Sequence, residues 1–524
     1  MKLHAQRTVT RRRLVALAAV TAAFTLLAGP ATAANDTTRV IVAFKPGAAA
    51  AVRGIVSQAR GAVQLEIFGM NAMAVEVPAR ALAGLARNPN VEYVEEDVKR
   101  YPLAATTPSD GITYASGQLV PYGIPMVQAD RVSDASAGLR KVCIIDSGYD
   151  LSHEDLAANA VNGDNDSGTG LWSTDENHHG THVAGTIAAI NNAGVGVVGV
   201  NPNKQLKLHI IKVFGATGWA YSSTLASAAN KCGAAGSNVI SMSLGGARSN
   251  KTEQRAFDSL YSKGVLSIAA AGNAGTTALS YPAAYASVVS VAALDENKAW
   301  ATFSQFNSDV ELAAPGVNVL STVPMGTGSA SALTVGSTVY APGGMDGSPK
   351  LTGSGALADF GLGGAAVAGS MTGMVCLIQR GTYDFATKVS NCQNSGGVGA
   401  VVYNNVAGGF GGTLGTTMTT IPSVTASDTE GAAMKLQLGQ SATLTVTATN
   451  YAYFDGTSMA TPHVSAVAAL VWSYFPTCTA AQIRSTLNKS ALDLGAVGRD
   501  TKFGYGLVQA KAAHTRIASQ GCAN

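Results

Sequence analysis

Apolar runs recur along the middle of the chain and alternate with segments of helical composition. These runs cover residues 141–145, 207–213, 238–242, 265–269 and 288–292. Short, continuous apolar runs are typical of strands that are buried on both faces. A helix-like segment such as residues 224–231 lies between successive runs, and this alternation predicts a doubly wound parallel sheet of the α/β class.

A smaller unit precedes this sheet. It consists of strand-like and helix-like segments at residues 39–45, 48–59, 73–77, 79–87 and 91–97. The last of these is an acidic strand. We expect a small α+β domain at residues 39–98, followed by a linker at residues 99–117 that is rich in Pro, Thr, Ser and Gly.

The pattern changes again after residue 324. Residues 325–450 are rich in Gly, Thr and Val and contain strand-like runs, which predicts a β-rich module. Gly456 then opens a long apolar helix at residues 463–474, and we expect Pro462 in its first turn, where proline is tolerated. The sheet domain is thus predicted as two parts, residues 118–324 and 451–515, with the module inserted between them and a tail at residues 516–524.

Composition narrows the class of protein. Of the 524 residues, 47% are hydrophobic and only 13% are charged, which suits a large folded core and argues against a disordered chain. The formal net charge of +3 comes from residues 1–104, whose 13 basic and 7 acidic residues outweigh a small negative excess in the rest. No basic patch indicates nucleic-acid binding.

The first residues have the pattern of an export signal. Arg11, Arg12 and Arg13 precede an apolar run at residues 14–28, and residues 31–33 (ATA) form a small-x-small cleavage site. We expect a signal peptide at residues 1–33 and a secreted, extracellular protein without stable membrane association. A short membrane anchor and a twin-arginine signal are the alternatives.

Six cysteines permit disulfide bonds in an exported chain. Cys376 and Cys392 are close enough in sequence to close a short loop, and a Cys478–Cys522 bond would attach the C-terminal tail. Cys143 and Cys232 either pair or remain buried thiols.

Four polar residues lie where strands end or helices begin. Asp146 ends an apolar strand, His179 opens a small-residue helix, Asn273 follows another strand, and Ser458 precedes the long apolar helix. In an open α/β sheet such positions meet beyond the carboxyl ends of the strands. Acyl transfer needs a nucleophile, a base, a group that orients the base and donors for the oxyanion. Each residue alone has a structural explanation, for example Ser458 as a helix cap, but together they predict this chemistry.

The chain resembles the subtilisin family in the segments that carry these residues. The matching segments are 142–148 (VCIIDSG), 179–186 (HGTHVAGT), 243–246 (SLGG), 270–273 (AAGN), 281–283 (YPA), 314–316 (APG) and 456–462 (GTSMATP). The resemblance implies a serine endopeptidase with Ser458 as nucleophile, His179 as general base and Asp146 as its partner. Asn273 and the Ser458 amide would form the oxyanion hole.

The same resemblance implies how a protein or peptide substrate would bind. An extended peptide would pair with two edge segments, residues 215–221 and 243–245. The substrate-binding residues would be Gly218, Ser243, Leu244, Gly245, Ala270 and Gly272. No carboxylate occurs in these segments, so we expect broad specificity with an apolar preference. Trp219 and Tyr221 either flank distal subsites or are simply exposed.

The resemblance also implies a structural calcium ion, which prefers six to eight oxygen ligands. The ligands would be Gln118, Asp155 and Asn192 with the carbonyls of Ile190, Val195 and Val197. Asp164, Asn165 and Asp166 either form another site or, as we expect, a solvated turn.

Two further segments resemble known domains. Residues 39–98 resemble the inhibitor prodomain of subtilisins, which implies a zymogen that is cleaved between Arg100 and Gly117 and inhibited by its own prodomain. Residues 373–381, 384–389, 399–405 and 421–424 resemble a protease-associated domain, which implies that the insert either modulates substrate access or is a passive spacer. We expect a monomer. The rival interpretations are a proteinase restricted to one partner protein and a catalytically dead surface-binding protein on the same scaffold.

Overall fold

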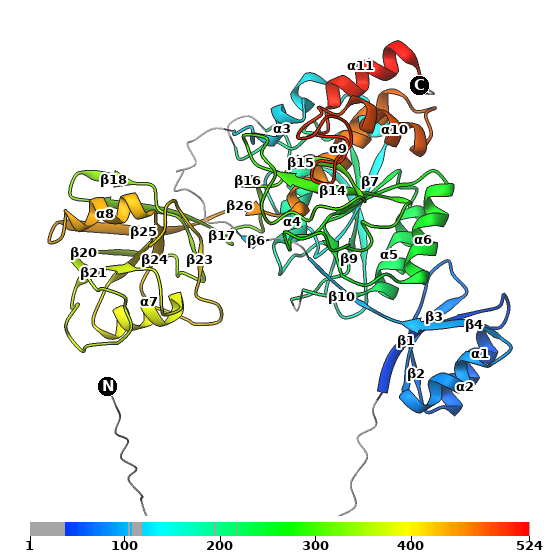
Figure 1. Ribbon diagram of the computed structural model, residues 1–524, viewed down its shortest axis with the longest axis horizontal. Helices are drawn as coiled ribbons and strands as arrows, with labels where there is room; N and C mark the ends of the chain where they lie inside the picture. Colours follow the sequence, from blue (N-terminus) through cyan, green and yellow to red (C-terminus); the bar gives the residue numbers. More distant parts are fainter. Residues whose placement is uncertain (1–36, 103–104, 107–117, 193–194, 217, 523–524) are drawn as a thin grey trace, which may run out of the picture.

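The structure is a computed structural model that describes residues 37–102, 105–106, 118–192, 195–216 and 218–522. The expected signal peptide, residues 1–33, and most of the expected linker lie outside the described residues. The chain forms a sheet domain, a small N-terminal domain beside it and an insert on its other side (Figure 1).

A seven-stranded sheet forms the centre of the sheet domain, and all its strands are parallel. Its order is β15 (Val310–Pro315), β14 (Val288–Leu294), β13 (Leu266–Ala270), β11 (Val239–Met242), β7 (Lys141–Asp146), β9 (Lys207–Lys212) and β8 (Ala160–Asn165). The predicted α/β class and the five predicted strands are confirmed. The two edge strands, β15 and β8, were not predicted, and Asp164 and Asn165 belong to β8 rather than to a turn.

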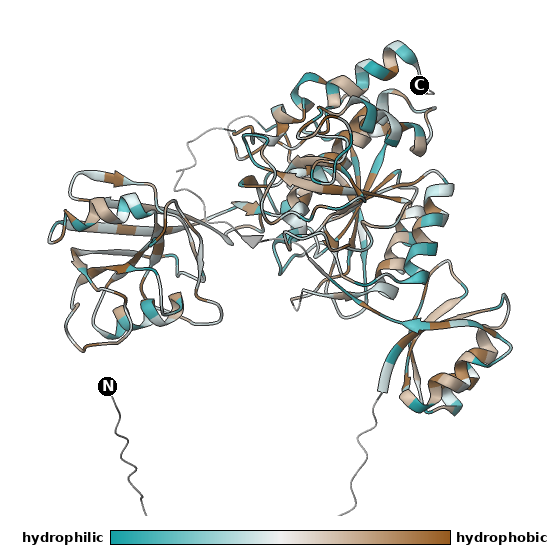
Figure 2. Ribbon diagram, viewed as in Figure 1, coloured by the Kyte–Doolittle hydropathy of each residue, from teal (hydrophilic) through white to brown (hydrophobic). Residues whose placement is uncertain are grey.

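Helices cover both faces of this sheet. Successive residues of β7 face opposite sides, since Val142 and Ile144 join one buried cluster while Cys143 and Ile145 join another. The helices α4 (His179–Ala188), α9 (Thr457–Tyr474), α10 (Ala480–Ser490) and α11 (Ala510–Gln520) belong to the first side, and α5 (Ser222–Ala234) and α6 (Lys251–Ser262) to the second. Figure 2 shows hydrophilic residues along the outer part of α6. The sheet is therefore doubly wound, as expected.

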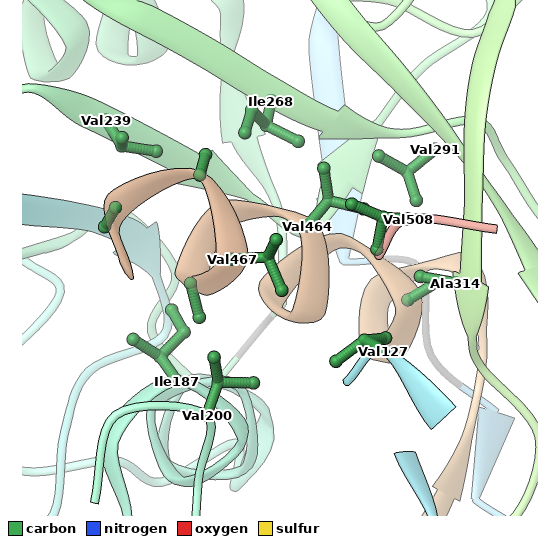
Figure 3. Close-up of a cluster of buried hydrophobic side chains, with 14 of the residues drawn as sticks. Val127, Ile187, Val200, Val239, Ile268, Val291, Ala314, Val464, Val467 and Val508 are labelled. Atoms are coloured by element: carbon green, nitrogen blue, oxygen red, sulfur yellow. The ribbon is translucent and has the colours of Figure 1, made fainter. Parts of the chain in front are cut away.

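The long helix α9 is the centre of the larger core. Its residues from Thr457 to Ser473 are all buried, as expected for a helix that is apolar on every side. Figure 3 shows Val464 and Val467 of α9 between the sheet, represented by Ile268 and Val291, and Ile187 of α4. Because α9 is surrounded, the position of its first turn is fixed by packing rather than by its own caps.

The N-terminal domain is a four-stranded antiparallel sheet with two helices. The strand order is β2 (Ala62–Glu66), β3 (Ala72–Pro78), β1 (Thr37–Phe44) and β4 (Val91–Glu96). The helices α1 (Ala49–Gln58) and α2 (Leu82–Ala86) contribute Val52 and Leu85 to a separate core. The mostly exposed strand β2 was not predicted. The domain lies against α5 and α6 (Figure 1).

The insert is built on a mixed seven-stranded sheet with the helices α7 (Phe385–Asn394) and α8 (Asp428–Lys435). Its order is β18 (Thr338–Tyr340), β17 (Gly328–Val335), β25 (Ser441–Thr449), β20 (Thr352–Asp359), β21 (Met374–Gln379), β22 (Gly399–Tyr403) and β24 (Ser423–Ala426). The short strands β19 (Met345–Asp346) and β23 (Gly412–Thr413) pair with each other. The chain enters and leaves the insert at adjacent points, because β16 (Val319–Thr322) pairs antiparallel with β26 (Tyr451–Asp455).

Short elements connect the domains. The strand β5 (Lys99–Pro102) follows the N-terminal domain and lies between β10 (Ala220–Tyr221) and β12 (Leu244–Gly245). The strand β6 (Ala105–Thr106) pairs with β26. The helical turns α3 (Gly123–Met126), η2 (Ala129–Arg131) and η3 (Ala137–Leu139) precede β7, and η1 (Ala79–Ala81) precedes α2.

Three disulfide bonds join Cys143 to Cys232, Cys376 to Cys392 and Cys478 to Cys522. The two predicted pairs are confirmed, and the third ties β7 to α5 within the second core. The predicted C-terminal boundary is wrong, because α11 continues to Gln520 and residues 516–520 are not a tail. Among the described residues, we find no helix whose length and hydrophobicity would let it cross a membrane.

Candidate active site

Asp146 and His179 form a buried pair at the carboxyl end of the sheet. Asp146 is the last residue of β7, and His179 is the first residue of α4. The ring nitrogen Nδ1 of His179 lies 2.7 Å from Oδ1 of Asp146, which also accepts the backbone N–H of Ser147 at 2.8 Å. The side chains of the pair are 3% and 0% exposed, so the contact is shielded from water. Because Nδ1 faces the carboxylate, Nε2 is the nitrogen that is left to exchange a proton.

Asp175 positions the start of α4, and it was missed in the sequence. Its Oδ2 accepts the N–H of Thr181 at 2.8 Å, and its Oδ1 accepts the hydroxyl of Ser147 at 2.8 Å. The Ser147 hydroxyl in turn accepts the N–H of Gly180 at 2.8 Å. Asp175 therefore connects the loop after β7 to the first turn of α4. An Asp just before a helical segment is a common cap, and this was the signal available in the sequence.

Charge around His179 favours its protonated form. Burial alone would lower the pKa of the ring, but the carboxylates of Asp146 and Asp175 outweigh burial and raise it above the ordinary 6.5. His182, one turn further on, differs because burial lowers its pKa to about 3. Its Nε2 lies 2.9 Å from the carbonyl oxygen of Val319, which indicates a structural role.

Ser458 lies in the first turn of α9 and is tied to Ser243 by two hydrogen bonds. The Ser458 hydroxyl donates to the Ser243 carbonyl at 3.0 Å, and the Ser243 hydroxyl donates to the Ser458 carbonyl at 2.7 Å. In the part of the chain that the structure describes, Nε2 of His179 has no hydrogen-bond partner. Catalytic hydrogen bonds are often long without substrate and tighten when it binds.

Pro462 explains why the Ser458 carbonyl is available. It lies in the second turn of α9, so the prediction that it falls in the first turn is wrong. A proline has no N–H, and the carbonyl four residues before it is therefore left without its helical donor. That carbonyl belongs to Ser458, and Ser243 supplies the donor instead. The proline thus connects α9 to the segment that contains β12.

Asn273 is held in one orientation beside α9. Its Oδ1 accepts the N–H of Thr457 at 2.9 Å and the Thr457 hydroxyl at 2.8 Å. The N–H of Gly272 also reaches the Thr457 hydroxyl, at 3.2 Å. These bonds join the loop after β13 to the N-terminus of α9. The opposite end of the Asn273 amide carries two N–H donors, which is the group an oxyanion requires.

The two expected edge segments do accept an extended peptide, which is β5 of the same chain. Arg100 is opposite Ala220 in β10, and Pro102 is opposite Leu244 in β12, both in antiparallel register. Leu244 and Gly245 thus line the groove, and Ser243 precedes them and is bonded to Ser458. Ala270 is the last residue of β13, two positions before Gly272, whose N–H reaches the Thr457 hydroxyl. Gly218 lies two residues before β10 in a left-handed conformation with φ 66°.

The distal aromatic residues contact basic side chains of the N-terminal domain and β5. The Lys99 ammonium lies 4.2 Å from the ring centre of Trp219, and the Arg39 guanidinium lies 3.9 Å from that of Tyr221. Both rings thus contact residues of the same chain, and whether they flank distal subsites for a substrate stays a prediction.

The N-terminal domain caps the two helices that it covers. Asp97 accepts the N–H of Ser223 at 2.8 Å at the start of α5, a helix whose own N-cap side chain makes no hydrogen bond. Glu95 accepts the N–H groups of Lys251 and Thr252, both at 2.7 Å, at the start of α6. The acidic strand seen in the sequence therefore supplies anions to two helix N-termini.

Most of the expected calcium ligands come together. The Nε2 of Gln118 lies 2.7 Å from the Ile190 carbonyl, 3.2 Å from the Val197 carbonyl and 3.2 Å from Oδ1 of Asn192. Asn192 also donates to Asp155 at 2.9 Å. No hydrogen bond among the described residues connects Val195 to this cluster.

The chemistry of this cluster fits calcium. It offers one carboxylate, side-chain amides and backbone carbonyls, which are the oxygen ligands that calcium prefers. Nε2 and Oε1 of Gln118 exchange places when the amide is turned, so an oxygen can occupy the position amid the three acceptors. Within the described ranges, no group of three or more His, Cys, Asp or Glu side chains is placed to hold a metal, so carbonyls would dominate any site here.

Comparison with known proteins gives two family matches. The model of the subtilase family matches residues 140–348 and 389–506, and that of the PA domain matches residues 335–434. Subtilisin DY from Bacillus licheniformis is 42% identical over 220 residues, which cover 40% of this chain and 77% of the relative. Subtilisin NAT from Bacillus subtilis subsp. natto is 35% identical over 318 residues, covering 59% and 79%.

Solved structures agree with these matches. The psychrophilic subtilisin-like protease Apa1 from the Antarctic psychrotroph Pseudoalteromonas sp. AS-11 is 44% identical with a TM-score of 0.60, covering 77% of this chain and 99% of its own. Fervidolysin from Fervidobacterium pennivorans shares the fold at 23% identity and a TM-score of 0.59, covering 92% and 61%. The chain belongs to the subtilase family and is a subtilisin-like serine endopeptidase with an inserted PA domain.

Proposed function

We propose that the chain is the exported precursor of a broad-specificity endopeptidase whose catalytic residues are Ser458, His179 and Asp146. The observation that carries this assignment is the buried 2.7 Å contact between His179 and Asp146, which leaves Nε2 as the base. Nε2 takes the Ser458 proton as Oγ bonds to the substrate carbonyl carbon. It then gives that proton to the leaving amine as the C–N bond breaks, and water hydrolyses the acyl-enzyme by the same route.

Two donors would stabilise the oxyanion that forms in each step. The side-chain amide of Asn273 is oriented by Thr457, and the Ser458 N–H lies in the first turn of α9, where the helix dipole favours negative charge. Loss of one such donor costs about 3–4 kcal/mol of transition-state stabilisation.

Covalent labelling tests the assignment. A fluorophosphonate should attach to Ser458 in the mature protein, and the label should be lost in Ser458→Ala and strongly slowed in His179→Ala. Peptide mapping locates the modified residue. Absence of label in a folded, processed protein would favour the dead surface-binding protein, whereas labelling without digestion of casein would favour the proteinase restricted to one partner.

The N-terminal domain would act as an inhibitor prodomain. This is supported by β5 in the groove and by the caps that Asp97 and Glu95 provide. The precursor should therefore process itself, and Ser458→Ala precursor should remain full length in culture medium. Cleavage of that variant at the same rate as the wild type would instead assign maturation to another protease.

We further propose that a calcium ion binds at Gln118, Asp155 and Asn192 with the carbonyls of Ile190 and Val197. Such an ion would hold the loop that follows α4. Val195 belongs to the same loop and remains a candidate ligand.

A further inference from the structure

We propose that Glu253 makes the groove selective for arginine at the fourth residue before the cleaved bond. This inference rests on the proposed function, since it names a substrate preference of the same site. It concerns a pocket beyond the residues predicted from the sequence, and it is carried by one buried ion pair between β5 and α6.

The position of Arg100 in the groove identifies the subsite. Arg100 is opposite Ala220, and Pro102 is opposite Leu244. In this antiparallel register, the residue of a bound substrate that lies three positions after the one in the place of Arg100 would be opposite Ser243. Ser243 and Ser458 are joined by two hydrogen bonds, so a bond cleaved beside Ser458 has Arg100 as the fourth residue on its N-terminal side.

The Arg100 side chain enters an enclosed pocket that ends in a carboxylate. The side chains of Arg100 and Glu253 are 1% and 0% exposed. Nε of Arg100 donates to Oε1 of Glu253 at 2.9 Å, and Nη2 donates to Oε2, so the pairing is bidentate. The rigid fork of a guanidinium matches a carboxylate in this way, whereas the single ammonium group of lysine does not.

Glu253 is not explained by capping its own helix. It is the third residue of α6, where a Glu ordinarily reaches back to the N–H of the N-cap residue. Here the N–H of Asn250 donates to the Tyr285 hydroxyl at 2.8 Å instead. That hydroxyl also lies 2.7 Å from Oε2 of Glu253. Tyr285 thus accepts the hydrogen bond of the N-cap N–H at the start of α6. The Glu253 carboxylate is therefore left to face the groove.

The Glu253 carboxylate is fully buried, and besides Arg100 and Tyr285 the charge of Asp97 acts on it. Leu244, Phe257 and Tyr285 belong to one buried cluster, against which Tyr281 also packs. Burial raises the pKa of Glu253, and the Arg100 guanidinium opposes that rise. A carboxylate buried without its cation is strongly destabilised. When β5 leaves the mature enzyme, a substrate with arginine at this position restores the pair, whereas leucine leaves the carboxylate unpaired.

Matched peptides test the proposal on the mature enzyme. Three internally quenched peptides would differ only at the fourth residue before the cut, which would be arginine, its neutral analogue citrulline or leucine, and mass spectrometry would confirm the cleaved bond. We expect kcat/KM for arginine to exceed that for either neutral residue by about tenfold or more, as for a buried charge pair. A ratio within about twofold would overturn the proposal.

Variants assign the preference to one carboxylate. Glu253→Leu, made together with Arg100→Leu so that the precursor retains a matched groove, should abolish or reverse the arginine preference. Asp258→Asn changes an exposed carboxylate on the same helix and should leave it unchanged. An arginine preference that persists in the Glu253 variant would also overturn the proposal.

If the double variant fails to mature, cleavage of the three peptides by the wild-type enzyme remains the decisive measurement. Cleavage of all three peptides at similar rates would refute only the arginine pocket. Absence of both peptide cleavage and fluorophosphonate labelling would refute the proposed function itself.

Discussion

A single carboxylate, Asp175, connects the loop after β7 to the helix that begins with His179. It accepts hydrogen bonds from Ser147 and Thr181, and its charge helps to raise the pKa of His179. Asp175 is therefore a positioning residue: it acts on the base through the geometry and electrostatics of α4.

Replacement of Asp175 by Asn should move the pH dependence of the enzyme. In the proposed mechanism His179 acts as a neutral ring, so kcat/KM should rise as pH passes the His179 pKa, which the two carboxylates place above 6.5. Removal of one negative charge lowers that pKa, and the rising limb should move to lower pH. The variant should also lose about 1–3 kcal/mol of stability, because Thr181 N–H would face an amide.

Profiles of kcat/KM against pH for wild type, Asp175→Asn and Asp258→Asn would measure this shift. The last variant removes a distant exposed carboxylate and serves as the control. A limb that stays in place in Asp175→Asn would show that Asp175 contributes only to stability.

Residues that the sequence points to lie in a short recognisable pattern, whereas residues that it does not point to depend on partners far away in the chain. Asp146, His179 and Ser458 each lie in a recognisable segment at the end of a strand or the start of a helix, so they could be proposed as catalytic residues from the chain alone. Glu253 meets Arg100 across 153 positions of sequence, and no local pattern marks a pair of that kind.

The N-termini of α5 and α6 are completed by a neighbouring domain. Asp97 supplies the side-chain acceptor at the start of α5, where Tyr221 occupies the N-cap position without providing one. The first N–H groups of a helix have no partner within the helix, and they are costly to leave unpaired when they are buried. These helices should therefore depend on the N-terminal domain while the precursor is intact.

Replacement of Asp97 by Ala should lower the thermal midpoint of the uncut precursor. The lost cap is worth about 1 kcal/mol by analogy with N-cap substitutions. The comparison is made in a Ser458→Ala background, so that processing does not intervene, and it is followed by calorimetry. Glu92→Gln on the same domain removes a largely exposed carboxylate, 3.7 Å from Arg255, and should have little effect. Equal midpoints for the Asp97 variant and its parent would contradict the capping role.

The loop after α4 should respond to chelation. Without calcium, the carbonyls of Ile190 and Val197 would have the Gln118 amide as their donor, as in this structure. A chelator should lower the melting temperature of the mature enzyme, and added calcium should restore it. Asn192→Ala should reduce the difference between the two conditions. A melting curve that a chelator leaves unchanged would remove the calcium proposal.

At the scale of elements, the interior strands of the large sheet were predicted and its two edge strands were missed, one of which, β15, is fully buried. The strands β7, β11 and β13 are continuous apolar runs and were found. The strands β2 and β8 have mostly polar or exposed residues, because one is at the edge of a small sheet and the other at the edge of the large one. Edge position is a tertiary property that local composition does not carry.

At the scale of the whole molecule, the insert interrupts the sheet domain at one junction, the pair of strands β16 and β26, which we call the seam. Thr322 of β16 is opposite Tyr451 of β26, and the N–H of Val323 donates to the Asn450 carbonyl at 2.8 Å. The two strands therefore continue as a hairpin up to the insert. Asn450 and Tyr451 also contact Glu154 beside the expected calcium site, at 2.9 and 2.8 Å.

Excision of residues 325–449 should leave the catalytic domain folded. A two-residue Asn-Gly turn between Pro324 and Asn450 would close the hairpin, and both contacts to Glu154 would be retained. We expect kcat/KM on a short peptide to stay within about threefold of the parent. A larger change on casein than on the peptide would indicate that the insert controls access of proteins. Loss of folding in the excised chain would instead make the insert a structural requirement.

The place of this seam also sets the order in which the ribosome completes the enzyme. All seven strands of the central sheet end by Pro315, but α9 begins only at Thr457, after the insert has been made. A growing chain thus carries Asp146 and His179 long before it has Ser458, so under the proposed assignment no unfinished chain can digest its neighbours. Until α9 emerges, the face of the sheet that it covers, including Ile268 and Val291, lacks its natural partner.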